Sequence, residues 1–279
     1  MSEMRQFRSR LNTLPIDMKV EIGEVVYQKG MRATSRRDKV VEVLTKYNIP
    51  FQNIGTGTNR HIIKYDGYVI KIALDREGVA DNKQEWVMSE ALKPHVADAF
   101  EISKGGHLLV ASYAPAFTSL NEMMFHRTTI TTILAEWSTR YLIGDVGMVS
   151  TNYANWGVNN QGKPVCIDYA YIFPASMNLF KCTCGNRSLN MINNYSQYKC
   201  PVCQKVYEDR DLRYKISQED RLAMFENVEG IQMFQDVETH PVEDRYIVPS
   251  NNPDLPDVYE TTFNAYMHMK RMGVRPKWD

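Results

Sequence analysis

Residues 155–169 read NWGVNNQGKPVCIDY, a segment that predicts two short strands joined by a turn. The turn is the Asn-Asn-Gln-Gly sequence at residues 159–162, because Asn and Gly readily adopt the positive φ angles of tight hairpins. Asn155 precedes the first strand and Asp168 follows the second, so the hairpin is expected to bring these two residues together. An amide oxygen next to a carboxylate suits Mg²⁺, which prefers oxygen ligands.

The spacing of Asn155 and Asp168 resembles that of the protein-kinase superfamily. In that family the Asn of the catalytic loop and the Asp of the DFG motif hold metal over the nucleotide phosphates. Here the motif reads Asp-Tyr-Ala at residues 168–170, a looser version. The resemblance implies that Asn155 and Asp168 bind Mg²⁺ and that ATP is a ligand.

A glycine-rich segment lies upstream, where residues 54–60 read IGTGTNR. Glycines allow backbone N–H groups to approach phosphates without interference from a Cβ atom. The resemblance makes Gly55, Gly57 and Arg60 candidate nucleotide contacts.

A lysine follows in residues 61–72, which read HIIKYDGYVIKI. This pattern predicts two strands joined by an Asp-Gly turn at residues 66–67. The segment at residues 69–71 resembles the V-A-I-K strand of kinases, and this maps the family's phosphate-binding lysine onto Lys71. An ammonium group in an apolar strand needs a partner, because burying it unpaired is costly. The alternative is that Lys71 caps an edge strand and points to solvent.

A helix is predicted over residues 80–93, after a turn at residues 75–78. Kinases place a Glu on this helix to pair with the lysine of the preceding strand. Glu90 lies nearer the spacing usual in protein kinases. We prefer Glu85, because residues 81–85 resemble the shorter form of this helix in bacterial and phage kinase-like proteins. Whichever glutamate is not the partner is expected to be a surface residue.

The catalytic loop departs from the kinase pattern. The catalytic Asp of kinases lies five residues before the metal-binding Asn, and this chain has Ser150 there. A serine does not accept a proton at neutral pH as a carboxylate does. Asp145 is the nearby acid, so either the loop carries an insertion and Asp145 is the base, or the base is lost and the protein is a pseudokinase. Insertions in loops cost little free energy, and the two alternatives remain open.

Two cysteine pairs form the most specific motif of the chain. Cys182 and Cys184 make a CxC pair, and Cys200 and Cys203 make a CxxC pair. Such pairs can present four thiolates tetrahedrally, which predicts a structural zinc site in a zinc ribbon. A redox CxxC alone would leave the first pair unexplained. Cys166 is predicted to be a core residue.

Charge and hydropathy narrow the function further. Lys plus Arg and Asp plus Glu each number 33 among 279 residues, so no global charge points to nucleic acid or to an anionic membrane. The chain has no apolar stretch long enough to span a membrane, and its start lacks the apolar core of a signal peptide. We expect a cytoplasmic protein without membrane partners. Basic residues near the cysteines permit nucleic-acid binding, but neighbouring acidic residues offset their charge. We therefore favour a zinc ribbon that stabilises the fold over one that binds nucleic acid.

The fold class expected from the resemblance is α+β, a two-lobed protein-kinase-like fold with a zinc-ribbon insertion. The predicted domains are an N-terminal arm (1–34), an N-lobe with an antiparallel sheet and a helix (35–115), a reduced helical C-lobe (116–279) and the ribbon within it (178–210). Further predicted elements are a helix over 36–47 with Ser35 as N-cap, a hairpin of strands 100–103 and 107–111, and helices over 121–142, 217–236 and 258–272.

The expected function is ATP- and Mg²⁺-dependent phosphotransfer to a protein or another host component by a phage- or bacterial-type kinase-like protein. Asp145, Lys71 and Asp168 are the candidate catalytic residues. One alternative is a pseudokinase that binds nucleotide or a partner without turnover. The other is a zinc-ribbon protein that contacts a protein partner, such as transcription machinery, or nucleic acid.

Overall fold

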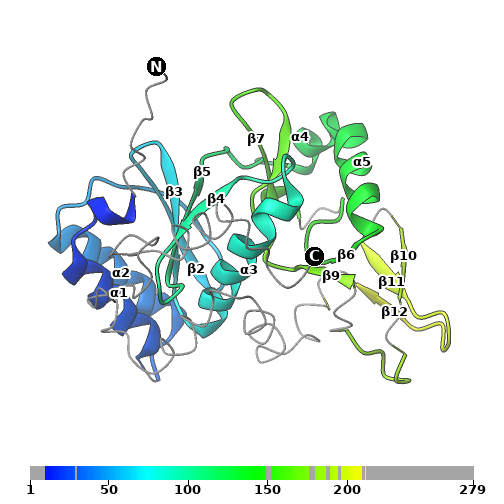
Figure 1. Cartoon of the computed structure of the whole chain (residues 1–279), viewed down its shortest axis with the longest axis horizontal. Coiled ribbons are helices and arrows are strands. Elements are labelled where there is room, and N and C mark those ends of the chain that lie inside the picture. The colour runs from blue at the N-terminus through cyan, green and yellow to red at the C-terminus, as the bar shows by residue number, and fades with distance from the viewer. Residues whose placement is uncertain are drawn as a thin grey trace, which may run out of the picture. The chain divides into compact units, whose positions relative to one another are not determined.

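The structure is a computed structural model that describes residues 10–28, 30–148, 152–175, 180–186, 189–193, 196–208 and 211. These residues form a mixed α+β structure with antiparallel strand pairs, which confirms the predicted class (Figure 1). The chain divides into two compact units. The described part of unit 1 comprises residues up to Lys83 together with Ala99–Ala111, and unit 2 comprises Gln84–Asp98 and the described residues from Ser112 onward.

Unit 1 contains a five-stranded sheet with strand order β1-β2-β3-β5-β4. Its strands are β1 (Gln52–Thr56), β2 (Arg60–Tyr65), β3 (Tyr68–Ala73), β4 (Ala99–Ile102) and β5 (Leu108–Ser112). The turn between β2 and β3 is confirmed: Asp66 and Gly67 both have positive φ, at 48° and 79°. Residues with this geometry match the twist of the antiparallel strands that they join. The predicted β4–β5 hairpin is confirmed as well.

Helices complete unit 1: η1 (Leu11–Thr13), α1 (Ile16–Tyr27) and α2 (Ala33–Lys46). Apolar side chains from both long helices join the core beneath the sheet; they include Met18, Ile22, Val40 and Leu44, together with Ile63 and Ile70 of the strands. The described residues of the predicted N-terminal arm therefore belong to the core of unit 1. Glu21 of α1 also accepts hydrogen bonds from Lys46 and Tyr47 at the end of α2.

The predicted start of α2 is wrong. The helix begins at Ala33, and Ser35 lies in its first turn rather than at its N-cap. The N-cap is Arg32, whose backbone is extended and whose carbonyl accepts the first helical hydrogen bond, from the N–H of Arg36 (3.0 Å). Capping preference pointed to the serine, but the chain turns into the helix three residues earlier.

Helix α3 (Arg76–Leu92) is longer than predicted. Residues 75–78 do not form a separate turn: the Asp75 carboxylate accepts the N–H of Gly78 (2.9 Å) and caps the helix start. A Cβ atom at Gly78 would overlap the carbonyl oxygen of Asn59, so this first turn requires glycine. The helix continues from unit 1, which ends here at Lys83, into unit 2.

Five consecutive polar residues of α3, 81–85, are buried, none more than 4 % exposed. A helical surface stripe would bury only every third or fourth residue. Asn82 shows why polarity is required, because its Nδ2 donates to the carbonyls of Lys71 (3.2 Å) and Gly106 (2.9 Å) and so ties the helix to the sheet of unit 1.

Unit 2 contains α4 (Leu120–Phe125), α5 (Arg127–Ser138), β6 (Tyr141–Ile143), η2 (Tyr153–Asn155), β7 (Trp156–Val158), β8 (Pro164–Cys166) and β9 (Ile172–Pro174). The single helix predicted over 121–142 is therefore wrong. Ser119 caps α4 by accepting the N–H of Glu122, and the chain leaves helical geometry at His126 (φ −100°, ψ 12°) before α5 begins. The end of the predicted helix forms β6, which pairs with β9.

The hairpin predicted from residues 155–169 is present as β7 and β8, paired antiparallel. Gly162 in its turn has φ 74°, and the Asn159 side chain accepts N–H groups from Gln161 and Lys163 (3.0 Å each). The core of unit 2 packs against this hairpin: Trp156 of β7 stacks on Trp137 of α5 with ring centroids 6.0 Å apart.

The cysteine-bearing segment forms a three-stranded antiparallel sheet, β10 (Asn190–Ile192), β11 (Gln197–Lys199) and β12 (Val206–Glu208), with β11 in the middle. The helices predicted over 217–236 and 258–272 lie outside the described residues. No helix in the described part of the chain is both long enough and apolar enough to cross a membrane.

Candidate functional site

The candidate nucleotide residues of unit 1 lie on β1, β2, β3 and the loop between the first two. Gly55 is in β1, and the N–H of Gly57 donates to the carbonyl of Arg60 (3.0 Å), which closes the loop. The Arg60 guanidinium is buried, with Nη1 3.5 Å from Oδ1 of Asn82. Lys71 lies in β3 and is 5 % exposed. The alternative of a solvent-facing edge lysine is wrong, because β3 is flanked by β2 and β5.

In unit 2 the hairpin brings Asn155 and Asp168 together, as predicted. The Asn155 carbonyl accepts the N–H of Ile167 (2.8 Å) and the N–H of Asp168 (3.3 Å). These contacts close the base of the β7–β8 hairpin, so the two candidate metal ligands are fixed as neighbours by the main chain.

Asp145 lies beside Asn155. Its carbonyl accepts Nδ2 of Asn155 (2.6 Å), and its backbone has φ 60°, which is uncommon for a residue other than glycine. The next residue is held too, since Nε1 of Trp156 donates to the carbonyl of Val146 (2.9 Å). Ser150, which occupies the position of the kinase base, lies outside the described residues.

Asp145, Asn155 and Asp168 thus form one hydrogen-bonded group, which we call the Asp-Asn-Asp group. All three residues are partly exposed. The Asn155 amide nitrogen is engaged by Asp145, which leaves its oxygen as the atom suited to a cation. Two carboxylates and one amide oxygen are the donor types that Mg²⁺ binds.

The two candidate glutamates of α3 have different surroundings. Glu85 is fully buried, and its Oε1 accepts the N–H of Tyr169 (3.3 Å), the residue after Asp168. Glu90 is exposed and pairs with Lys93 (3.1 Å). Glu90 is therefore the surface residue of the two, and the pairing of Glu85 with the β3 lysine stays a prediction.

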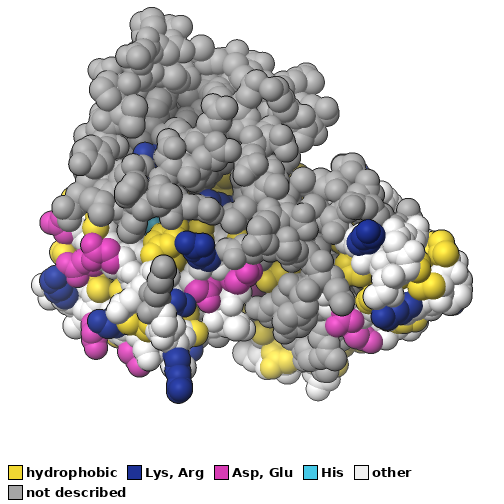
Figure 2. Space-filling model, turned by 90° about the horizontal axis from the view of Figure 1, so that it is seen from below, with side chains coloured by type: hydrophobic (Ala, Val, Ile, Leu, Met, Phe, Trp, Pro, Cys, Tyr) yellow, Lys and Arg dark blue, Asp and Glu magenta, His cyan; other side chains and the backbone are white. Residues whose placement is uncertain are grey.

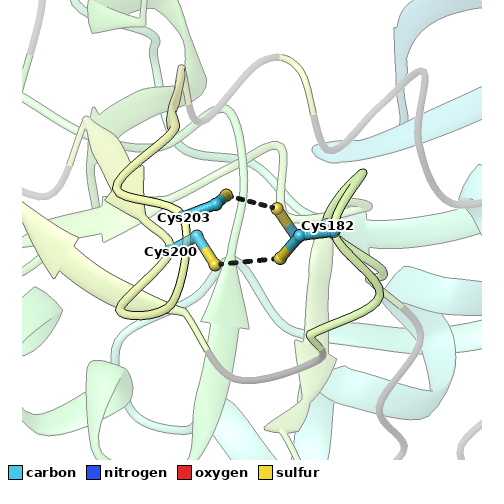
Figure 3. Close-up of side chains that lie close together, drawn as sticks. Cys182, Cys200 and Cys203 are labelled. Atoms are coloured by element: carbon cyan, nitrogen blue, oxygen red, sulfur yellow. Dashed lines mark hydrogen bonds between the residues drawn. The ribbon is translucent and has the colours of Figure 1, made fainter.

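The four predicted zinc ligands, Cys182, Cys184, Cys200 and Cys203, form one cluster with all Sγ atoms within 4.8 Å of one another. The Sγ atoms of Cys182 and Cys203 are 3.5 Å apart, and those of Cys184 and Cys200 are 3.6 Å apart (Figure 3). Tetrahedral zinc with Zn–S bonds of about 2.3 Å would separate its sulfurs by about 3.8 Å, so the donor set fits this metal. Cys166 lies outside the cluster, fully buried in β8.

Two tight turns present these sulfurs. In the first, the N–H of Gly185 (φ 91°) donates to the carbonyl of Cys182 (2.8 Å). In the second, the N–H of Gln204 (φ 62°) donates to the carbonyl of Cys200 (2.9 Å). Positive φ reverses the chain directly after each cysteine pair ends, and this turns both pairs toward one point.

The Tyr207 hydroxyl makes Cys182 a better metal ligand. It accepts the N–H of Thr183 (3.2 Å) and lies 3.1 Å from the Cys182 sulfur, so its own hydrogen is available to that sulfur. This hydrogen bond lowers the pKa of Cys182 to about 6. The backbone N–H of Cys203 lowers the pKa of Cys200 in the same sense. Metals bind the thiolate form, which both effects favour.

Sequence reasoning missed Tyr198 and Tyr207, whose hydroxyls both make hydrogen bonds. Tyr198 is 2 % exposed. Its hydroxyl accepts a hydrogen bond from the N–H of Ile143 and donates one to the carbonyl of the same residue (2.6 Å each). The available signal was the choice of Tyr over Phe at buried strand positions, since a buried Tyr hydroxyl usually has a partner.

Basic and acidic side chains of the described residues are interspersed on the face shown in Figure 2. This agrees with the equal numbers of basic and acidic residues in the sequence.

Comparison of the chain with protein-family models and with curated proteins found no match.

Proposed function

We propose that the chain is a kinase-like protein that binds ATP with Mg²⁺ and transfers a phosphoryl group to a protein or another host component. The observation that carries this proposal is the Asp-Asn-Asp group, in which three residues chosen from the sequence are joined by hydrogen bonds. A two-lobed kinase-like fold is part of the proposal. Its support is the order of a five-stranded sheet, a lysine on the third strand, a following helix and a later hairpin that ends in Asp168.

The proposed roles of the candidate residues differ between the two units. In unit 1, the backbone at Gly55 and Gly57 contacts phosphates, with Arg60 as a further contact and Lys71 as the phosphate-binding cation. In unit 2, Asn155 and Asp168 hold Mg²⁺, which neutralises charge that develops on the phosphates. Positioning and electrostatic stabilisation supply most of the catalysis in phosphoryl transfer.

Asp145 is the proposed catalytic base. Although it lies ten residues before Asn155 in the sequence, the hydrogen bond from Nδ2 of Asn155 holds its backbone beside that residue. The spacing of ten residues is therefore compatible with Asp145 as the base. This observation favours an active enzyme over a pseudokinase.

We further propose that the four-cysteine cluster binds one structural zinc ion that staples the β10–β12 sheet. The support is the set of four clustered sulfurs, two pairs of which lie 3.5 Å and 3.6 Å apart, and the hydrogen bonds that favour the thiolate forms of Cys182 and Cys200. When bound, zinc supplies the cross-link for a segment that has few apolar side chains of its own.

Binding and transfer are tested with the full chain. Mg-ATP at about 100 times its Kd should stabilise the wild type by about 2.7 kcal/mol in thermal unfolding. Lys71→Ala and Asp168→Ala should abolish this shift, whereas Glu90→Gln, a change of an exposed glutamate on the same helix as Glu85, should retain it. A wild-type protein that shows no Mg-ATP-dependent shift would contradict nucleotide binding.

Catalysis is tested separately with ATP labelled at the γ-phosphate. Asp145→Asn should keep the Mg-ATP shift but lose label transfer to the protein itself and to lysate components. Binding without any transfer by the wild type would identify a pseudokinase instead.

A further inference from the structure

The cysteine-bearing sheet is joined to the rest of unit 2 through Tyr198. This residue lies in the middle strand β11, and its buried hydroxyl accepts the N–H of Ile143 and donates to the carbonyl of Ile143, both at 2.6 Å. A single side chain thus pairs both backbone groups of one residue in β6.

Neither the N–H nor the carbonyl of Ile143 is directed toward β9, the strand that pairs with β6. The N–H of Gly144 donates to the carbonyl of Tyr171 (2.8 Å), so Gly144 directs its backbone groups toward the β9 side. Alternate residues of an antiparallel strand face opposite edges, and Ile143 therefore directs its N–H and carbonyl away from β9. Ile143 is fully buried, where unpaired backbone groups are strongly disfavoured. Tyr198 acts in place of a third strand.

The bonds to Ile143 are made two residues before Asp145. Asp145 has φ 60°, a conformation that persists only where the surroundings hold it. On one side the segment is held by Tyr198 at Ile143, and on the other by Trp156 at Val146. The Asp145 carbonyl that accepts from Asn155 lies within this clamped segment.

The opposite end of the connection is the cysteine cluster. Tyr198 is two residues from Cys200, and it lies opposite Tyr207 in the β11–β12 pair. The hydroxyl of Tyr207 contacts the sulfur of Cys182 (3.1 Å). The cluster therefore fixes the strand that carries Tyr198 from both cysteine pairs.

We propose that Tyr198 is a positioning residue through which the four-cysteine module controls the Asp145 segment and, with it, Mg²⁺-dependent binding of ATP. The ATP part rests on the proposed function. Occupancy of the cysteine site then regulates the Asp-Asn-Asp group without any cysteine contacting the nucleotide.

The test compares Tyr198→Phe with Tyr141→Phe in the full chain. Tyr141 lies on the same strand as Ile143, and its hydroxyl has no hydrogen bond to a described residue. Tyr198→Phe should keep the wild-type zinc content but raise amide exchange at residues 143–146 about tenfold, the equivalent of one net hydrogen bond. The Mg²⁺ concentration for half-maximal ATP binding should rise several-fold, with ATP affinity in the absence of Mg²⁺ unchanged, whereas Tyr141→Phe should match the wild type in all three measurements.

A second measurement needs no variant. Removal of the metal from wild-type protein with a chelator should raise exchange at the same four residues, whether or not Tyr198→Phe folds. Unchanged exchange after both treatments overturns the inference, as does normal Mg²⁺ dependence in a Tyr198→Phe protein with raised exchange. A wild type that binds no Mg-ATP overturns the proposed function and the ATP part of the inference, while the exchange results still decide the control of the Asp145 segment.

Discussion

At the scale of single residues, a substitution of Gly55 distinguishes a structural role of this glycine from a role in nucleotide binding. A Cβ atom there would lie 3.9 Å from Cβ of Ile62, an ordinary contact, and the position has no positive φ. We expect Gly55→Ala to change the free energy of unfolding by less than about 0.5 kcal/mol. If phosphates approach this backbone, the variant should lose about tenfold in ATP affinity, measured by titration.

Gly157 gives the matched control, because a Cβ atom there would overlap the Pro115 carbonyl. Gly157→Ala should cost about 1–3 kcal/mol of stability in thermal or urea unfolding. Equal destabilisation by the two substitutions would show that Gly55 is also a packing position.

Glu101 predicts a pH dependence of stability in unit 1. This β4 residue is 3 % exposed, and its carboxylate accepts the N–H groups of Arg10 (2.7 Å) and Leu11 (3.2 Å). Burial raises its pKa from 4.5 to about 6. The folded state thus holds the proton more tightly than the unfolded chain, so the stabilisation by protonation is complete below about pH 4.5 and is lost as the pH rises through about 6.

The measurement is the difference in unfolding free energy between the wild type and Glu101→Gln across pH 4 to 7. The wild type should lose about 2 kcal/mol relative to the variant over this window. A difference that does not vary with pH would mean that Glu101 titrates alike in the folded and unfolded states.

At the scale of elements, the β10–β12 sheet should depend on its metal. Cys200→Ser removes one of four clustered sulfurs and should reduce bound zinc from one per chain to nearly none, as measured by elemental analysis. Cys166→Ala is the control, since Cys166 is the fifth cysteine and lies in β8. Loss of zinc from the control as well would place the metal elsewhere.

Local chemistry explains which elements were predictable. The turns at residues 66–67 and 159–162 contain the Asp, Asn and Gly that positive φ requires, and the cysteine pairs carry their spacing in the sequence. The end of α5 at Ser138 was not predictable, because apolar residues continue at helical spacing from α5 to Tyr141 in β6. Strand β6 exists only because β9, which is remote in the sequence, pairs with it.

The candidate site was predictable to a similar degree. Asn155 and Asp168 followed from a local hairpin, but the contact of Asn155 with Asp145 depends on the path of the intervening loop. The Tyr198 bonds to Ile143 join residues 55 positions apart, and no local pattern indicates them.

At the scale of the whole molecule, the described residues form two large cores that share no residue. Ile70 is 1 % exposed in the core of unit 1, and Ile133 is 2 % exposed in the core of unit 2. Ile70→Ala and Ile133→Ala should each cost about 2–5 kcal/mol. Hydrogen exchange should rise mainly in the unit that carries the substitution, and an equal rise in both units would indicate a single cooperative structure.

The buried polar residues 81–85 of α3 limit which substitutions the chain can tolerate there. Asn82 donates to carbonyls of unit 1, whereas Gln84 donates to the Ile172 carbonyl of unit 2 (2.6 Å). A leucine at position 82 or 84 would leave buried backbone carbonyls without a hydrogen-bond donor. Saturation mutagenesis should thus find an unbroken block of intolerant codons at 81–85, and defects at codons 82 and 84 should disturb different halves of the protein.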